Sequence, residues 1–182
     1  MIDEIALVKD LQTPSLKEIA FRKLIRTYKE RLYWHIRKIV INHEDTDDVL
    51  QNTFIKVFKN IDRFNAQSKL YTWLYRIATN EAISFIQKKA KEKNVDLNEY
   101  HTSVASTLLH DVLFDGDEIA LLLQKAIATL PEKQKLVFTM KYFDEMKYEE
   151  ISNILETSVG ALKASYFHAV KKIENYIKAT AH

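Results

Sequence analysis

The 182-residue sequence contains no cysteine, only two glycines and only two prolines. The absence of cysteine excludes disulfide bonds and thiolate metal sites. Glycine and proline supply most tight turns, so their scarcity leaves little turn chemistry for a multi-stranded sheet. Because 47% of the residues are hydrophobic, the chain can still bury a substantial core. The composition therefore predicts an almost wholly helical protein with one large or two small domains.

The sequence also lacks a run of 18 apolar residues, and no basic segment precedes an apolar one at its start. We therefore expect a cytoplasmic protein with no membrane insertion. Lysine and arginine exceed aspartate and glutamate by 27 − 25 = 2, so the chain is not globally basic. A nearly neutral total with local basic patches suits a protein that meets an acidic surface on one side only.

Motifs of catalysis are missing as well. The sequence has no HExxH zinc motif and no phosphate-binding loop, and it has too little glycine for a dinucleotide site. No nucleophile, base and orienting partner can be assembled from it. The sequence thus predicts no enzymatic activity, no catalytic residue and no cofactor.

The stretch around which the chain is organised begins with a helix over residues 45–61. Asp45 is the expected N-cap, with Asp48 in the first turn, where acidic groups suit the helix dipole. Apolar residues at steps of three and four predict a buried arc of Leu50, Phe54, Val57, Phe58 and Ile61. The opposite arc consists of Asp48, Gln51, Asn52, Ile55 and Lys59. Spacing alone leaves open whether this outer arc is an ordinary wet surface or a docking surface.

A second helix starts at residue 70, after a short polar loop. Its inner side is predicted to hold Leu70, Trp73, Leu74, Ile77 and Ala78, and its far end is basic, with Lys88, Lys89, Lys91 and Lys93. In the loop, Phe64 and Tyr71 stand on either side of amide and hydroxyl side chains. An aromatic ring beside hydrogen-bonding groups can receive an unstacked base of single-stranded nucleic acid. The alternative is that Phe64 only fills the space between the helices.

Ahead of this pair, residues 21–39 carry a long apolar stripe at helical spacing: Phe21, Leu24, Ile25, Tyr28, Leu32, His35, Ile36 and Ile39. His35 is expected to be a packed imidazole, since no second ligand stands at metal spacing on the same helix. Residues 41–48 gather acidic side chains around His43. They could hold Mg²⁺ or Ca²⁺, but they lack the glycine and the final glutamate of a calcium loop. Helix capping is the preferred interpretation, and no metal site is predicted.

Residues 94–117 sustain no helical face and are predicted to be a linker, with one short helix near residues 108–114. An amphipathic helix then starts at Asp117 or Glu118, with Ile119, Leu122, Leu123, Ala126, Ile127 and Leu130 on its apolar face. Pro131 opens a helix over residues 132–142, with Leu136, Val137 and Met140 inward. A short helix over residues 148–155, a turn over 156–158 and a final helix capped by Ser158 complete a helix-turn-helix layout.

The final helix, from Val159, sorts into two faces. Its buried stripe is predicted to consist of Val159, Leu162, Tyr166, Val170, Ile173 and Ile177. Gly160, Lys163, Ala164, Phe167 and Lys171 point the other way, flanked by His168 and Lys172. A duplex-reading helix needs cations for phosphates or guanine edges beside small or apolar groups for thymine methyls. An exposed Phe167 is unusual on a solvated face, although a surface helix with solubilising lysines remains an alternative.

Several of these residues carry a resemblance to a known family. Asp48-Val49-Leu50-Gln51, Phe54, Phe64, Trp73-Leu74-Tyr75-Arg76-Ile77-Ala78 and Asn80 resemble region 2 of the extracytoplasmic-function (ECF) sigma factors, the promoter-specificity subunits of bacterial RNA polymerase. Leu130-Pro131-Glu132-Lys133-Gln134, Tyr148-Glu149-Glu150-Ile151 and Ser158-Val159-Gly160-Ala161-Leu162-Lys163 resemble sigma region 4. The sequence departs from the family's pattern at Glu156, where glycine is frequent, and at Ser84, Gln87, Ser152 and Ser165. These departures bear on the DNA sequence that is recognised more than on the role.

The resemblance implies two helical domains joined by a flexible linker: region 2 over residues 1–93, the linker over 94–117 and region 4 over 118–182. It implies a sigma factor that binds core RNA polymerase, at the β′ clamp and the β flap, and directs initiation at promoter DNA. The residues expected to contact the polymerase are Asp48, Gln51, Asn52 and Ile55. Those expected to contact melted −10 DNA are Phe64, Asn65, Ser68, Lys69, Tyr71, Arg76, Asn80, Lys88 and Lys89. Those expected to contact the −35 duplex are Tyr148, Gly160, Lys163, Ala164, Phe167, His168, Lys171 and Lys172. An anti-sigma factor is a further partner in this family, and we expect a monomer when the chain is free.

Two other functions remain open from the residues alone. A helix-turn-helix repressor or activator, whose first half dimerises or senses a ligand, would bind duplex promoter DNA by itself, commonly as a symmetric dimer. A helical adaptor would bind neither DNA nor polymerase. Transcription with purified core polymerase separates the three.

Overall fold

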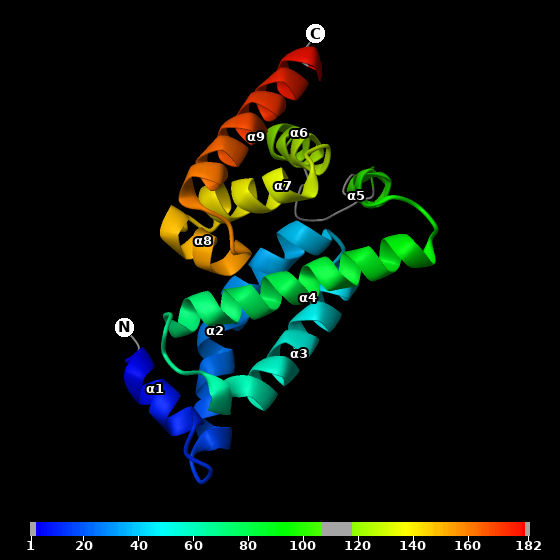
Figure 1. The fold of residues 1–182 in the computed structure, drawn as a ribbon. Coiled ribbons are helices and arrows are strands. Elements are labelled where there is room, and N and C mark those ends of the chain that lie inside the picture. Colours follow the sequence, from blue (N-terminus) through cyan, green and yellow to red (C-terminus); the bar gives the residue numbers. More distant parts are fainter. Residues whose placement is uncertain (1–2, 107–117, 181–182) are drawn as a thin grey trace. The chain divides into compact units, whose positions relative to one another are not determined.

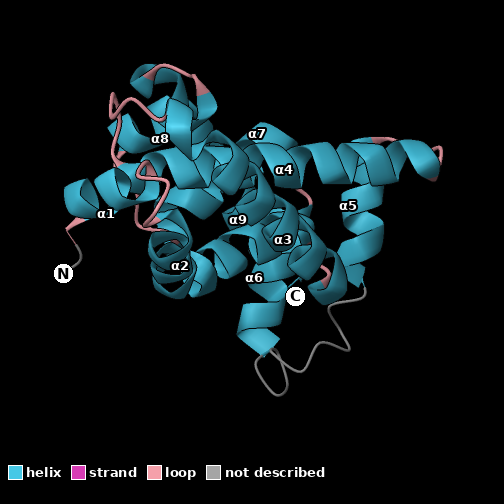
Figure 2. Cartoon of the chain, turned by 90° about the horizontal axis from the view of Figure 1, so that it is seen from below, coloured by secondary structure: helices cyan, strands magenta, loops and turns pink. Residues whose placement is uncertain are grey.

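The computed structural model describes residues 3–106 and 118–180. Within these ranges it contains helices and loops and no strand (Figures 1 and 2), which confirms the predicted all-α class. The α-helices are α1 (Glu4–Leu11), α2 (Lys17–Val40), α3 (His43–Asn60), α4 (Leu70–Glu92), α5 (Leu97–Ser106), α6 (Glu118–Ala128), α7 (Glu132–Phe138), α8 (Tyr148–Leu155) and α9 (Val159–Thr180). A 3₁₀ turn, η1 (Ile61–Arg63), follows α3, and a π-helical turn, η4 (Thr139–Phe143), follows α7. None of the described helices is long and apolar enough to cross a membrane.

Contacts divide the chain into two compact units, Met1–Ile83 and Ser84–His182, so that α4 begins in the first unit and ends in the second. The domain limits at residues 93 and 118 come from the sequence pattern, and they stay predictions. Part of the predicted linker is the helix α5, which Asp96 caps by accepting the backbone N–H of Glu99 at 2.9 Å. The helix predicted near residues 108–114 lies outside the described residues.

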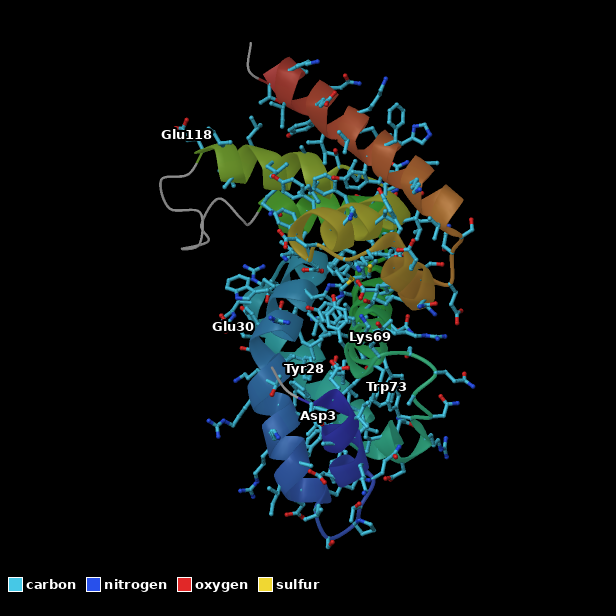
Figure 3. The ribbon with its side chains drawn as sticks, turned by 90° about the vertical axis from the view of Figure 1, so that its left-hand side faces the viewer. Asp3, Tyr28, Glu30, Lys69, Trp73 and Glu118 are labelled. Atoms are coloured by element: carbon cyan, nitrogen blue, oxygen red, sulfur yellow. The ribbon has the colours of Figure 1, made fainter. Side chains whose placement is uncertain are left out.

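The first unit is built on α2, against which α1 and α3 pack. The apolar stripe predicted for α2 is buried or half-buried along its whole length. Helix α1 has a weaker pattern, and it is held by buried Leu7 and Leu11 and by the Asp3 cap, which accepts two backbone N–H groups. Tyr28 of α2 donates a hydrogen bond to Glu4 of α1 at 2.7 Å (Asp3 and Tyr28 are labelled in Figure 3). Burial and this bond raise the pKa of Tyr28 well above its usual value.

A buried hydrogen bond joins α2 to α4. His35 is fully buried, and its Nε2 lies 2.9 Å from Thr79 Oγ1, while the Thr79 hydroxyl donates to the Tyr75 carbonyl at 2.7 Å. A hydroxyl has one hydrogen, so Thr79 accepts from His35, which places a proton on Nε2. The imidazole also packs on the Tyr75 ring, with centroids 4.7 Å apart. The predicted packed imidazole is thereby confirmed.

The start of α3 differs from the prediction. The helix begins at His43, and its N-cap is Asn42, whose side chain accepts the backbone N–H of Asp45 at 2.9 Å. The prediction that Asp45 is the cap was wrong, because Asn42 lies where the chain is still extended and Asp45 already lies in the first turn. The chain reverses between α2 and α3 at Ile41, which has a φ of 74° and a buried side chain. This φ is rare for a β-branched residue, and burial of the side chain offsets part of its cost.

The second unit has its core between α6, α7 and α9. The buried members of this core are Ala126, Ile127, Leu130, Phe138, Ala169 and Ile173. The rings of Phe138 and Tyr166 are stacked, with centroids 5.8 Å apart and planes 14° apart. Leu162 is buried, and Val170 and Ile177 are half-buried, as the stripe predicted for α9 requires. Ile119 was predicted to share the apolar face of α6 but is 81% exposed, because the packed part of α6 starts one turn later.

Helices α8 and α9 form the predicted helix-turn-helix, and they pack on each other. Ser158 caps α9 as predicted, since its hydroxyl accepts the backbone N–H of Ala161 at 3.3 Å. The turn passes through Glu156, whose φ of 50° and ψ of 42° are left-handed. Glycine adopts this conformation at the lowest cost, and here a residue with a side chain occupies it.

Replacing the acceptor of His35 tests the link between α2 and α4. Thr79→Val should lower the free energy of unfolding of the first unit by about 1–3 kcal/mol, because a buried N–H loses this acceptor. Thr79→Ser keeps the hydroxyl and should lose less. Trp34 and Trp73 both lie in the first unit, so tryptophan fluorescence during urea unfolding reports on this unit. Equal midpoints for the two variants would show that the hydrogen bond contributes nothing.

Replacing Glu156 tests whether the left-handed turn between α8 and α9 lowers the stability of the second unit. Glu156→Gly should stabilise it by about 0.5–1 kcal/mol, since the strain of a Cβ in the left-handed region exceeds the entropy cost of glycine. The matched control, Glu156→Ala, keeps the Cβ and should bring no such gain. Hydrogen exchange of the α8 and α9 amides measures the effect, and equal protection in both variants would contradict it.

Candidate functional site

The outward face of α3 is polar with an apolar centre. Asp48, Gln51 and Asn52 are exposed, and Ile55 lies among them with 45% of its surface exposed. Phe58 was predicted to face inward, yet it is 38% exposed. It lies at the edge of the helix, where its ring contacts the ring of Phe21 at 4.9 Å and the Lys17 ammonium lies 4.9 Å from it. An apolar centre with a polar rim is the composition of a protein-binding surface.

The loop between η1 and α4 differs in one respect from the expected base-binding site. Phe64 is only 8% exposed, and its ring packs against Trp73 with centroids 5.2 Å apart. Its ring therefore fills the interior here and offers no open stacking surface, which corrects the expectation that it receives a base. Asn65 and Lys69 are exposed and Ser68 is half-buried, so the polar side chains remain accessible (Lys69 and Trp73 are labelled in Figure 3).

The first turns of α4 present the other expected residues. Tyr71 is half-buried and packs on Tyr75, with centroids 4.5 Å apart. Arg76 and Asn80 are exposed and stand four residues apart, so they share one side of the helix. Tyr71 lies nearer the polar loop and about half a turn around the helix from Asn80, so it does not share their side. Arg76 and Asn80 together can hydrogen-bond a base and a phosphate.

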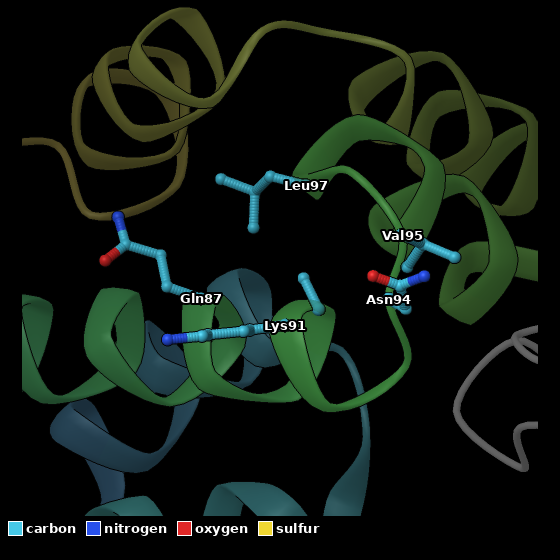
Figure 4. A pocket seen from close by; sticks show the side chains of 6 residues that line it. Gln87, Lys91, Asn94, Val95 and Leu97 are labelled. Carbon is cyan, nitrogen blue, oxygen red and sulfur yellow. The ribbon is translucent and has the colours of Figure 1, made fainter.

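The basic end of α4 belongs to the second unit. Lys88 is exposed and lies 3.8 Å from Glu92, and the Lys89 ammonium lies 5.2 Å from the Phe85 ring. Beside them is a hollow of about 420 Å³ that the sequence did not predict (Figure 4). Lys91 and Gln87 reach it from α4 and Leu97 from α5, and Ala90, Asn94 and Val95 complete its lining. Its lining thus combines one ammonium group and two side-chain amides with aliphatic groups.

The outward face of α9 is as predicted. Gly160, Lys163, Ala164, Phe167, His168, Lys171 and Lys172 are all exposed. Phe167 has 54% of its surface exposed, and the Lys171 ammonium lies 5.0 Å from its ring. A Cβ added to Gly160 would meet no atom within 4 Å, so packing inside the unit does not require glycine there. The face has cations at both ends of an apolar and small-residue centre.

Tyr148, at the start of α8, joins this face to η4. Its ring lies 5.8 Å from the Lys163 ammonium and 5.1 Å from the ammonium of Lys141, which also donates to the Met146 carbonyl at 3.1 Å. Burial, and to a lesser extent the nearby Tyr166, raise the pKa of Tyr148, so the phenol stays protonated and able to donate. Two ammonium groups beside one tyrosine ring concentrate positive charge that can receive a phosphate. Lys141 was missed by the sequence analysis, because only the fold brings it to Tyr148.

Comparisons with known proteins match both halves of the chain to one family. Residues 24–92 match the family model of sigma-70 region 2, and residues 120–173 match that of sigma-70 region 4. The chain is 34% identical, over 152 residues, to the ECF RNA polymerase sigma factor SigW of Bacillus subtilis, an alignment that covers 79% of this chain and 81% of that one. The chain belongs to the ECF sigma factor family. The ECF RNA polymerase sigma-E factor of Haemophilus influenzae is 29% identical over 184 residues, covering 95% of this chain and 94% of that one.

Solved structures agree with the fold of this ECF sigma factor. CnrH in complex with the cytosolic domain of CnrY gives a TM-score of 0.71 at 20% identity, with 97% of each chain covered. The sigma factor RpoE in complex with the anti-sigma factor NepR from Bartonella quintana gives 0.68 at 20% identity, with 87% of this chain and 96% of that one covered. Sigma factors are non-catalytic regulatory proteins, and the family models that match describe no enzyme. Among the described residues, no group of three or more histidine, aspartate and glutamate side chains could hold a metal ion.

Proposed function

We propose that this ECF sigma factor joins core RNA polymerase and directs initiation at a subset of promoters by reading a −35 duplex and a melted −10 strand. The observation that carries the proposal is the presence of two exposed faces, on α3 and α9, within the segments that match sigma regions 2 and 4. The protein itself performs no chemistry in this function, and it acts where the polymerase does, in the cytoplasm.

The face of α3 binds the polymerase. Ile55 supplies the apolar contact, and Asp48, Gln51 and Asn52 surround it with groups that can hydrogen-bond the partner. The buried arc of the same helix anchors it through Leu50 and Val57, so the outward groups are held on a rigid element. This arrangement supports docking on the β′ clamp.

The loop and the start of α4 hold an unpaired −10 base. Unstacking and unpairing a base costs a few kcal/mol, which the contacts made to the flipped base must offset. Asn65, Ser68, Tyr71 and Asn80 provide hydrogen bonds and a ring edge, and Lys69 with Arg76 provides charge for the flanking phosphates. Phe64 contributes as the buried support of the loop. Lys88 and Lys89 extend the cationic surface along α4.

The face of α9 enters the −35 major groove. Lys163 and Lys171 serve phosphates or guanine edges, and Ala164 and Phe167 contact thymine methyls. Tyr148, with Lys141, positions the phosphate backbone next to Lys163. His168 and Lys172 lie along the flank of this face, and the second unit also meets the β flap.

Two solved structures with this fold are complexes with another protein, one of them a named anti-sigma factor, and we propose that such a protein binds this chain as well.

Transcription in vitro tests the promoter role. Core polymerase with this chain should produce transcripts from a library of genomic fragments that core alone does not produce. Lys163→Glu should reduce them about tenfold or more, because a carboxylate replaces a cation at the DNA. Lys178→Glu makes the same charge change about two turns beyond Lys171, near the end of α9 and past the proposed contact residues, and it should leave transcription unchanged. No new transcripts with the wild-type chain would refute the proposal.

Removing the polar rim of α3 tests the polymerase contact. The double variant Asp48→Ala and Gln51→Ala should bind core polymerase about tenfold more weakly, because interface hydrogen bonds are lost. Binding is measured by competition with the wild-type chain, and helix content by circular dichroism. The control is Lys29→Ala, an exposed site on α2 outside the proposed face, and it should leave binding unchanged. If the double variant unfolds, the face was assigned wrongly.

A further inference from the structure

The segment ahead of the region 2 match holds the loop that follows η1. The match starts at residue 24, so α1 and the first turns of α2 lie outside it. The Gln12 side-chain amide donates to two backbone carbonyls about fifty residues away, that of Ile61 at 3.0 Å and that of Phe64 at 2.7 Å. One amide nitrogen has two hydrogens, so each carbonyl can receive its own. Both hydrogens are therefore used on the turn from which the loop departs.

A second contact fixes the same turn. The Lys17 ammonium lies 2.6 Å from the Asp62 carboxylate. In the sequence, Asp62 stands between Ile61 and Phe64, whose carbonyls accept from Gln12. This ion pair is partly exposed, so by itself it contributes little. With Gln12 it gives three polar contacts to residues 61–64, all from residues 12–17. On its other side, the Phe64 ring is fixed against Trp73.

The element that carries Gln12 is itself anchored. Leu7 and Leu11 of α1 are buried, and Tyr28 binds Glu4 at the other end of that helix. Gln12 directly follows α1 as its C-cap, with its own backbone N–H bonded to the Val8 carbonyl at 3.0 Å. The amide therefore projects from a fixed point, and the turn it holds leads directly to exposed Asn65.

We propose that Gln12 is a positioning residue for capture of the unpaired −10 base, an inference that rests on the proposed function. Ordering a loop upon binding costs conformational entropy for each residue fixed. By donating to the carbonyls of Ile61 and Phe64, Gln12 orders the start of the loop before DNA binds, so less conformational entropy is lost on binding. The same bonds set the direction in which residues 65–69 extend from the η1 turn. The role belongs to the N-terminal segment of this chain, outside the matched region.

The test compares two neighbouring variants in the full chain with core polymerase. Gln12→Met keeps the length of the side chain and removes both donors, and Thr13→Val removes a hydrogen bond that is local to α1, from Thr13 Oγ1 to the Lys9 carbonyl at 2.8 Å. The DNA is a fork junction with an unpaired non-template −10 strand, made from a promoter that this chain uses. Gln12→Met should weaken binding of the fork junction about five- to tenfold, the equivalent of one or two hydrogen bonds, and Thr13→Val should not.

Three further readouts separate positioning from general damage. Affinity for core polymerase and affinity for a duplex with only the −35 element should stay as in the wild type, and the urea midpoint of the first unit should fall by no more than the loss of two hydrogen bonds explains. Faster hydrogen exchange in residues 62–69 should accompany the loss of fork-junction binding. Equal fork-junction binding by the two variants, or an equal loss in all readouts, would overturn the positioning role alone. If the wild-type complex fails to bind the fork junction, the proposed function falls and the role with it.

Discussion

The first unit depends on the packing of α2 against its neighbours, with the hydrogen bond from His35 to Thr79 in its interior. Because α2 buries its apolar stripe against α1 and α3, and reaches α4 through His35, the rotation of each helix about its axis is fixed. A helix that buries one arc must present the other. The outward set of α3 around Ile55 and the outward set of α4 around Arg76 and Asn80 are therefore consequences of the core. The second unit follows the same rule, since the stack of Phe138 on Tyr166 and the burial of Leu162 turn Lys163 and Phe167 outward.

Each unit has its own core, and each carries a different kind of surface. The face of α3 has an apolar centre and a polar rim, which suits a protein. The face of α9 has cations around small and aromatic groups, which suits a duplex. The loop before α4 has amides and hydroxyls supported from beneath by a buried ring, which suits a single strand. Three surfaces of different chemistry on one small helical chain fit the proposed function, in which the chain joins core RNA polymerase and two forms of DNA.

Helical periodicity predicted most of the fold, because burial on one arc is a local property of the sequence. The buried stripe of α2, the outward set of α3 and the outward set of α9 follow from spacing alone. The errors came where tertiary contacts decide. In the sequence Phe64 has the surroundings of an exposed aromatic residue, but in the fold it packs against Trp73. Ile119 continues the apolar spacing of α6 beyond the part of the helix that is packed. Asn42, and not Asp45, is the N-cap of α3, because the chain reverses at Ile41. Helix α5 has few apolar residues, although Asp96 followed by Glu99 was a capping signal. Gln12 and Lys141 act across the fold, at separations that no local pattern records.

In the proposed function, one unit joins the polymerase and a melted strand while the other binds intact duplex. Permanganate footprinting of a promoter measures this directly, because permanganate attacks unpaired thymines. With the chain and core polymerase together, thymines near −10 should react and the −35 region should be protected, and neither component alone should open the DNA. Protection of the −35 region by the chain alone as a twofold dimer, with no reactive thymine when polymerase is added, would contradict the account.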